Sequence, residues 1–462
     1  MQSTTAKPGL FVTEDGQNLA FTFALVCTLF FLWAMCNGMI DVMDKHFQNE
    51  LGLTKSQSAW VQFAHYLGYF LMSMPAGILA SKLGYKRGII MGLVIVALGG
   101  FWFVPATYIN SLVHTGSVSA NMAFVGFLGG VCLIATGLTF LETIANPYTT
   151  VLGAPRLAAT RINLAQSCNG LGWIFGPPLG GIFFYSKDAA GRSTGSETLY
   201  IPYVALAIGA LLIAVVFWFA NVPDIKMKDE YHLDDSGAQD VRSVWSHPHF
   251  VLAVAAQFFY VAAQAGIFSF FINYMTSESP AIPGPWAAGN LATWFETNKA
   301  GVLTFSDKGA ANIASLAFGC FLLGRISGSW LLKKYSAHKV LGVYGLANVI
   351  ATLLVFFKLG WFSVFCVFAS YFFMSIMFPT IFALGIYGLG ARAKKASAFI
   401  VMAIMGGAVL PKLMGYVADQ YDMSRGFIVP MFCFAFVAFY GFRWPRFSGV
   451  ESLHGAELKA GH

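Results

Sequence analysis

The chain has 462 residues, of which 57% are hydrophobic and only 11% are charged. A soluble domain carries about 25% charged residues, so this composition excludes an ordinary soluble protein and indicates a protein embedded in a lipid bilayer. The net charge of +7 does not indicate a nucleic-acid partner, because the basic residues lie mainly in short loops between apolar segments.

Twelve apolar segments follow one another along the chain, each long enough for a helix that crosses a membrane. We predict these helices at 19–43, 57–80, 88–107, 121–146, 158–185, 199–221, 250–275, 310–333, 339–357, 361–387, 396–418 and 426–445. Lysine and arginine are concentrated in alternate loops. The positive-inside rule therefore predicts a multi-pass membrane protein with both termini in the cytoplasm.

A polar, charged stretch divides the twelve segments into two sets of six. We predict a cytoplasmic tail at 1–18, an N-terminal six-helix bundle at 19–221, a cytoplasmic linker at 222–249, a C-terminal six-helix bundle at 250–446 and a second tail at 447–462. The expected fold class is an all-α membrane protein, with twelve transmembrane helices in two pseudo-symmetric bundles.

The two halves share sequence features. Small residues followed by cations occur at 77–87 after the second helix and at 324–334 after the eighth. Asn146-Pro147 and Phe378-Pro379 occupy matching places in the fourth and tenth helices and predict a break in each. Duplicated halves with broken helices are typical of secondary transporters, whose site lies between the halves.

Two acids lie inside predicted helices, where a charge costs about 2.5–3.5 kcal/mol. Asp41 follows Trp33 and Asn37 at steps of four residues, so the three side chains share one helix face. Glu142 lies in the segment GLTFLETIANP. We interpret both acids as proton-binding groups of a transporter. Two alternatives remain: the first helix could end near Met39 and leave Asp41 among headgroups, or Glu142 could pair with a neighbouring side chain.

Amide and aromatic side chains occur on the same faces of several helices, a combination that suits the hydroxyls and the C–H face of a sugar ring. The candidates for substrate binding are Trp33, Asn37, Gln62, Tyr66, Gln166, Asn169, Gln257, Tyr260 and Gln264. Amides also join membrane helices to one another, which is the alternative explanation for some of them.

Four further residues are possible contacts: His65, Asn146, Phe378 and Lys412. His65 fits a buried core position better than a proton relay. Lys412 either extends to the outer membrane interface or faces the site, and we favour the interface.

Other classes of chemistry lack support in the sequence. No Gly-rich phosphate loop, metal-ligand cluster or nucleophile–base pair is recognisable, so we expect no enzyme, no metal and no cofactor other than the proton as coupling ion. The seven cysteines lie in apolar segments without CxxC spacing and are interpreted as packing residues. The expected partners are a monosaccharide, the proton and the lipid bilayer, with the chain acting as a monomer and binding no nucleic acid.

Several segments resemble known families. The duplicated loop resembles the signature of the major facilitator superfamily, although Ser81 stands where that signature usually has an acid. The resemblance narrows to the fucose:proton symporter family, which includes glucose/galactose transporters, in the segments FFLWAMCNGMIDVM, FLETIANPYTTVLG, RINLAQSCNGLG, QFFYVAAQ, GRISGSWLL, FPTIFALGI and AFIVMAIMGGAVLPKLMGYVAD. It implies proton-coupled import of a neutral monosaccharide, L-fucose or a related hexose, with Asp41 and Glu142 cycling protons. Phe378 departs from the fucose permease, which has a tyrosine there, so one sugar contact is missing.

One motif favours a different activity. Gly172-x-x-x-Gly176-Pro177 resembles the antiporter signature of drug exporters in the same superfamily, so export of small molecules by proton antiport is an alternative. Close helix packing through small residues would explain the same motif. A sugar uniporter and a membrane sugar sensor are further alternatives.

Overall fold

The computed structural model describes residues 10–13, 16–114, 116–153, 158–189, 193–223, 244–287, 289–298, 301–389 and 393–449. Both predicted tails fall partly outside these ranges, as do residues 224–243 of the predicted linker. The described chain is almost entirely helical. Its one small sheet is an antiparallel hairpin of β1 (Phe295–Thr297) and β2 (Leu303–Phe305).

The N-terminal half contains six long helices and two short ones. They are α1 (Ala20–Leu51), α2 (Lys55–Ser58), α3 (Trp60–Leu83), α4 (Tyr85–His114), α5 (Ala120–Val151), α6 (Ala158–Phe184), α7 (Gly195–Thr198) and α8 (Tyr200–Phe219).

The C-terminal half also forms six spans, three of which are interrupted. Its α-helices are α9 (Pro248–Ser269), α10 (Phe271–Ser277), α11 (Asp307–Lys334), α12 (Ala337–Phe356), α13 (Trp361–Met374), α14 (Met377–Ile386), α15 (Ala393–Met402), α16 (Gly406–Gln420), α17 (Met423–Gly426) and α18 (Ile428–Ser448). Short 3-10 turns are η2 (Val244–Ser246), η3 (Gly284–Ala287), η4 (Gly289–Trp294) and η6 (Ala403–Met405).

The lengths and hydropathy of these helices fit a membrane. Ten helical segments among the described residues are long and apolar enough to cross a bilayer. Helices α3 and α6, with 24 and 27 residues, are also long enough and complete a set of twelve. Large apolar side chains cover the outer surface, as at Phe219, which is 82% exposed. The predicted fold class is confirmed.

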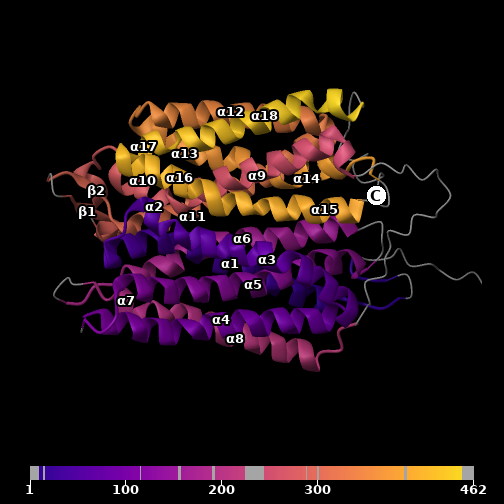
Figure 1. Ribbon diagram of the computed structural model, residues 1–462, viewed down its shortest axis with the longest axis horizontal. Coiled ribbons are helices and arrows are strands. Elements are labelled where there is room, and N and C mark those ends of the chain that lie inside the picture. Colours follow the sequence, from indigo (N-terminus) through magenta and orange to yellow (C-terminus); the bar gives the residue numbers. More distant parts are fainter. Residues whose placement is uncertain are drawn as a thin grey trace, which may run out of the picture.

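The two halves lie side by side with their helices roughly parallel to one long axis (Figure 1). We call the end that carries α2, α7, the β1–β2 hairpin and α17 the hairpin end, on the left in Figure 1. The opposite end, from which the chain leaves α8 and enters α9, is the linker end. Helix α6 packs against α11 and α3 packs against α16, so these pairs form much of the contact between the halves.

Helix α6 also packs tightly on α1. A Cβ atom at Gly172 would lie 2.4 Å from the carbonyl oxygen of Phe31, and one at Gly176 would lie 2.8 Å from that of Met35. Only glycine allows so close an approach of two backbones. The motif that resembles an antiporter signature therefore has a packing role in this chain.

The predicted helix breaks are only half correct. The tenth span is interrupted at Ser375-Ile376, between α13 and α14. The fourth span is continuous, because α5 runs through residues 146 and 147 to Val151. A proline inside a membrane helix is tolerated where nearby polar groups satisfy the backbone.

The first span is longer than its apolar segment. Helix α1 continues to Leu51, about two turns past the predicted end at residue 43. The alternative in which the helix ends near Met39 is therefore wrong, and Asp41 lies within the helix.

Candidate functional site

The polar face of α1 is turned toward α3. Trp33 Nε1 donates a hydrogen bond to the Tyr69 hydroxyl at 2.5 Å, and Gln62 Nε2 donates to Asp41 Oδ1 at 3.2 Å. Asn37 and Asp41 are only 7% and 8% exposed. The predicted stripe thus faces the interior of the protein, where Trp33 meets Tyr69 and Asp41 meets Gln62 of α3.

A second acid lies beside Asp41. Asp44 is fully buried, and the same Gln62 Nε2 donates to its Oδ2 at 3.3 Å. The Ser269 hydroxyl also donates to Asp44 Oδ2, and Ser269 is the last residue of α9 in the other half. The sequence analysis assigned no role to Asp44. Its position three residues after Asp41, on the same helix face, was the available signal.

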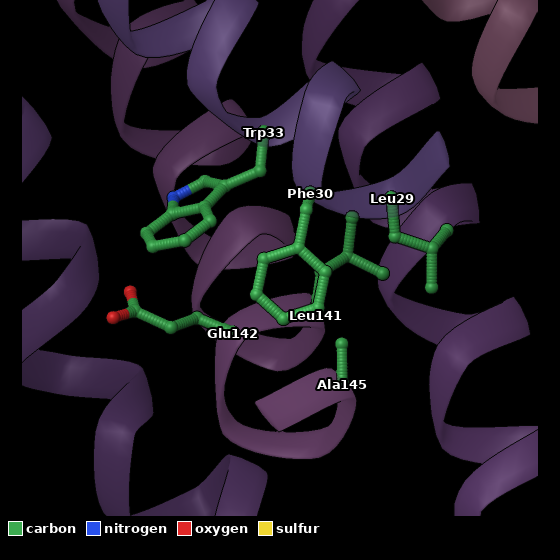
Figure 2. Close-up of a pocket in the computed structure, with 6 residues that line it drawn as sticks. All are labelled: Leu29, Phe30, Trp33, Leu141, Glu142 and Ala145. Carbon is green, nitrogen blue, oxygen red and sulfur yellow. The ribbon is translucent and has the colours of Figure 1, made fainter. Parts of the chain in front are cut away.

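Glu142 projects from α5 toward the tyrosines of α3. It interacts electrostatically with Tyr66 and Tyr69. It also lines a small, narrow pocket with Leu29, Phe30, Trp33, Leu141 and Ala145. Figure 2 shows the Glu142 carboxylate on the same side of the pocket as the Trp33 indole. The carboxylate therefore faces other parts of the protein.

Asp41, Asp44 and Glu142 have no cationic partner among the residues that the structure describes. Arg161, a cation that follows Glu142 in the sequence, instead donates to the carbonyl oxygens of Thr149 at 2.9 Å and Gly153 at 3.3 Å. The alternative in which Glu142 pairs with a neighbouring basic residue is thus not what the structure contains.

A hydrogen-bond chain connects the halves near Glu142. Arg325 Nη1 of α11 donates to Gln166 Oε1 at 3.3 Å, and Gln166 Nε2 donates to Asn146 Oδ1 at 3.1 Å. Asn146 in turn contacts the Glu142 backbone. Arg325 was missed in the sequence analysis, although a single arginine within the eighth apolar segment is a signal in itself.

The C-terminal half supplies a second polar face. Gln257, Tyr260 and Gln264 lie on one side of α9, and the Tyr260 hydroxyl donates to the carbonyl oxygen of Met374 at 3.0 Å. The Phe378 ring is 6.4 Å from that of Tyr260. Gln257 is fully buried, and neither its Nε2 nor its Oε1 has a hydrogen-bond partner within the described protein. An unsatisfied buried polar group costs about 1–3 kcal/mol, so this amide is suited to a ligand.

Three further candidate residues make packing or interfacial contacts. Asn169 Nδ2 donates to the Phe30 carbonyl oxygen at 3.4 Å, which joins α6 to α1. His65 is buried with its ring 5.0 Å from the rings of both Tyr66 and Tyr69. Lys412 is exposed, and its Nζ lies 3.9 Å from the centre of the Trp60 ring, which agrees with an interfacial position.

Polar contacts close the hairpin end between the halves. Asp307 accepts a hydrogen bond from Asn49 at 2.6 Å and lies 3.8 Å from Lys45. Asp419 lies 3.7 Å from the Lys55 amine and accepts the backbone N–H groups of Lys55 and Ser56 at 3.0 and 2.9 Å. Each of these contacts joins the N-terminal half to the C-terminal half, so the hairpin end is shut in this conformation.

Metal ligation has no basis in the described part of the chain, where no cluster of three or more histidine, cysteine, aspartate or glutamate side chains is placed to hold an ion. The polar groups described above are instead amides, hydroxyls, an indole, carboxyls and the Arg325 guanidinium.

Comparison with known proteins agrees with this arrangement. The sequence profile of the Major Facilitator Superfamily matches residues 22–384. The L-fucose-proton symporter of Escherichia coli (strain K12) is 34% identical over 446 residues, covering 92% of this chain and 93% of that protein. A glucose/galactose transporter of Brucella abortus is 31% identical over 430 residues, covering 93% and 95%.

Solved structures give the same result. The crystal structure of FucP, a Major Facilitator Superfamily transporter in the outward conformation, has a TM-score of 0.62 at 33% identity and covers 92% of this chain and 99% of that one. The D-xylose-proton symporter has a TM-score of 0.66 at 11% identity, covering 93% and 98%, which supports the fold alone.

Proposed function

This chain belongs to the major facilitator superfamily, and we propose that it is a proton-coupled symporter that imports a neutral monosaccharide across a bacterial inner membrane. The relatives named for L-fucose, glucose and galactose make these sugars the first candidates. The observation that carries the proposal is the placement of Asp41 and Glu142 inside spanning helices, beside amides and aromatic rings and without a cationic partner.

The two acids supply the coupling chemistry. A charged carboxylate within the bilayer costs about 2.5–3.5 kcal/mol, so a passage that contains two ionised acids resists closure. Protonation removes that cost and lets the passage close around its cargo. The acids then release their protons on the side where the proton concentration is lower, and the membrane potential adds about 2.3 kcal/mol per charge per 100 mV.

The sugar binds between the halves in this proposal. Trp33 and Gln166 offer an aromatic face and an amide from the N-terminal half, and Gln257 offers an unpaired amide from the C-terminal half. A monosaccharide has both hydroxyls for the amides and a C–H face for the indole. The bound sugar thereby satisfies the Gln257 amide, which has no partner within the described protein.

Alternating access is the proposed transport mechanism. We place the hairpin end outside the cell, both termini in the cytoplasm, and the bundles at 19–221 and 250–446 as the two bodies that rock about the central site. The closed contacts at Asp307 and Asp419 then represent a shut outer gate. The transporter acts as a monomer and needs no cofactor other than the coupling proton.

Uptake into proteoliposomes tests the proposal. With an imposed pH gradient, acid outside, the wild-type protein is expected to accumulate labelled L-fucose, glucose or galactose above the external concentration. Glu142→Gln is expected to lose this accumulation while it still exchanges internal for external sugar, because the amide mimics the protonated acid. Normal accumulation by both Glu142→Gln and Asp41→Asn would refute the coupling assignment.

A further inference from the structure

Asp44 holds a position that the coupling mechanism does not use. It lies on α1 one turn beyond Asp41, and Gln62 donates one hydrogen bond to each of the two carboxyls. Asp44 is fully buried, and its Oδ1 has no partner within the described protein. A buried carboxylate with so few donors is far less stable than the neutral acid, which also can donate a hydrogen bond of its own.

The contact that Asp44 makes with the other half is specific. The Ser269 hydroxyl meets Asp44 Oδ2, and residue 270 interrupts the seventh span directly after Ser269, between α9 and α10. Gln48, one turn farther along α1, continues the same interface by accepting from Asn273 Nδ2 of α10 at 2.6 Å. Asp44 thus lies at the inner edge of the contacts that close the hairpin end.

No cation in the described part of the chain forms an ion pair with Asp44. The titratable groups of this region are Asp41, Lys45 and His46 on α1, Tyr66 on α3, Tyr185 on α6, Asp307 on α11 and Tyr371 on α13. Lys45 is directed to Asp307, His46 Nδ1 is 2.9 Å from the Phe184 carbonyl oxygen, and the Tyr185 hydroxyl donates to the Val42 carbonyl oxygen at 2.9 Å.

We propose that Asp44 is a second proton-binding site, separate from the coupling acids, which locks the hairpin end when it is protonated and releases it when it is ionised. The neutral acid fits the dry contact with Gln62 and Ser269. The ionised acid needs water, which reaches it only if α9 and α10 move away from α1. The proposal rests on the proposed function only in assuming that the two halves alternate between closed and open arrangements.

The coupling between proton release and gate opening sets the size of the expected pH effect. Each proton that must leave for the gate to open changes the ratio of open to closed protein by up to tenfold per pH unit. If Asp44 is such a site, opening of the hairpin end becomes more favourable as pH rises. Removing its titration lowers the slope of the logarithm of that ratio against pH by about one.

The distance between spin labels on the two halves measures gate opening without any sugar. Glu197 on α7 and Tyr421 at the end of α16 are exposed, lie at the hairpin end and belong to different halves. Labels carried there on an unnatural amino acid leave the seven native cysteines unchanged. The full-length protein in lipid nanodiscs is measured between about pH 5 and pH 9, a range that contains ordinary and strongly perturbed carboxyl titrations.

We expect the long-distance population of the wild-type protein to grow with pH. Asp44→Asn, whose amide still reaches Ser269, is expected to favour the short distance and to lower the slope by about one. Ser269→Ala is expected to increase the open population at pH 5, where Asp44 is protonated. Asp307→Asn is the matched control at the same interface, because it removes an acid that is paired with Lys45 and is expected to shift the population equally at every pH.

An unchanged slope in Asp44→Asn would overturn the proposal, and so would an unchanged distribution at pH 5 in Ser269→Ala. Sugar uptake separates this result from the proposed function. Asp44→Asn is expected to keep accumulation driven by a pH gradient, with the wild-type ratio of protons to sugar. Loss of one transported proton would make Asp44 a coupling acid and would refute its assignment to the gate. Failure of sugar transport in the wild-type protein would leave the distance measurement unaffected.

Discussion

Replacing Gln257 by leucine is expected to change stability and sugar binding in opposite directions. Both polar atoms of this side chain are buried without partners in the described protein. Leucine is similar in size and has no polar group, so the substitution removes an unsatisfied amide worth about 1–3 kcal/mol of destabilisation. We therefore expect the melting temperature of the sugar-free protein to rise.

The same substitution removes the sugar's partner. Two neutral hydrogen bonds at about 0.5–1.5 kcal/mol each give a loss of about 1–3 kcal/mol in binding. That loss corresponds to a dissociation constant raised about 5- to 150-fold, since 1.4 kcal/mol is a factor of ten. Isothermal titration calorimetry of the purified protein with L-fucose, glucose and galactose measures the affinity, and a thermal melt without sugar measures the stability.

Asn348→Leu is the matched control. Asn348 is also fully buried with both amide atoms unpaired, but it lies on α12, which packs against α13, α14 and α18 within its own half. We expect it to raise the melting temperature without altering sugar affinity. If Gln257→Leu lowered the melting temperature and left sugar affinity unchanged, the amide would be structural and the argument for a ligand at this position would be refuted.

Three further variants test other contacts. Trp33→Phe removes the hydrogen bond to Tyr69 and part of the stacking surface, so we expect weaker sugar binding in calorimetry; an unchanged affinity would exclude Trp33 from the site. Arg325→Lys is expected to slow sugar exchange about tenfold, because one ammonium cannot reproduce the guanidinium fork. Hydrogen bonds to charged groups are worth roughly 1.5–3 kcal/mol. Exchange at the wild-type rate would contradict this expectation. Asp419→Ala is expected to open the hairpin end in the spin-label experiment at all pH values, since it removes the ion pair and both backbone contacts at α2; an unaltered distance distribution would contradict a gate role.

The sequence was sufficient for the fold class and the number of spans. Hydrophobic length decides where a helix can cross a bilayer, and that property is readable one segment at a time. Helix ends were less predictable. Helix α1 extends to Leu51, and its last turn bonds to the other half through Gln48 with Asn273 and through Asn49 with Asp307. These contacts depend on partners far away in the chain.

The fourth and tenth spans illustrate another limit. Both contain a proline at a matching place, yet only the tenth is interrupted. Whether a proline breaks a helix depends on which groups satisfy the backbone around it. The sequence indicates where a break is permitted but not whether it occurs.

The candidate site was also only partly predictable from the sequence. The spacing of Trp33, Asn37 and Asp41 on one helix face predicted a polar stripe, and the structure places that stripe against α3. Asp44 became a candidate only through its hydrogen bonds with Gln62 and with Ser269, which is 225 residues away along the chain. No local pattern reports a contact of that kind, so its discovery required the fold.

The central claim is that sugar and protons cross the membrane together. The most direct measurement is the internal pH of sugar-free proteoliposomes, followed with a trapped fluorescent indicator while L-fucose, glucose or galactose is added outside without an imposed gradient. The account predicts that a transported sugar acidifies the interior, in proportion to the sugar that enters, and that Glu142→Gln abolishes the acidification. Entry of sugar at the wild-type rate with no change in internal pH would contradict it.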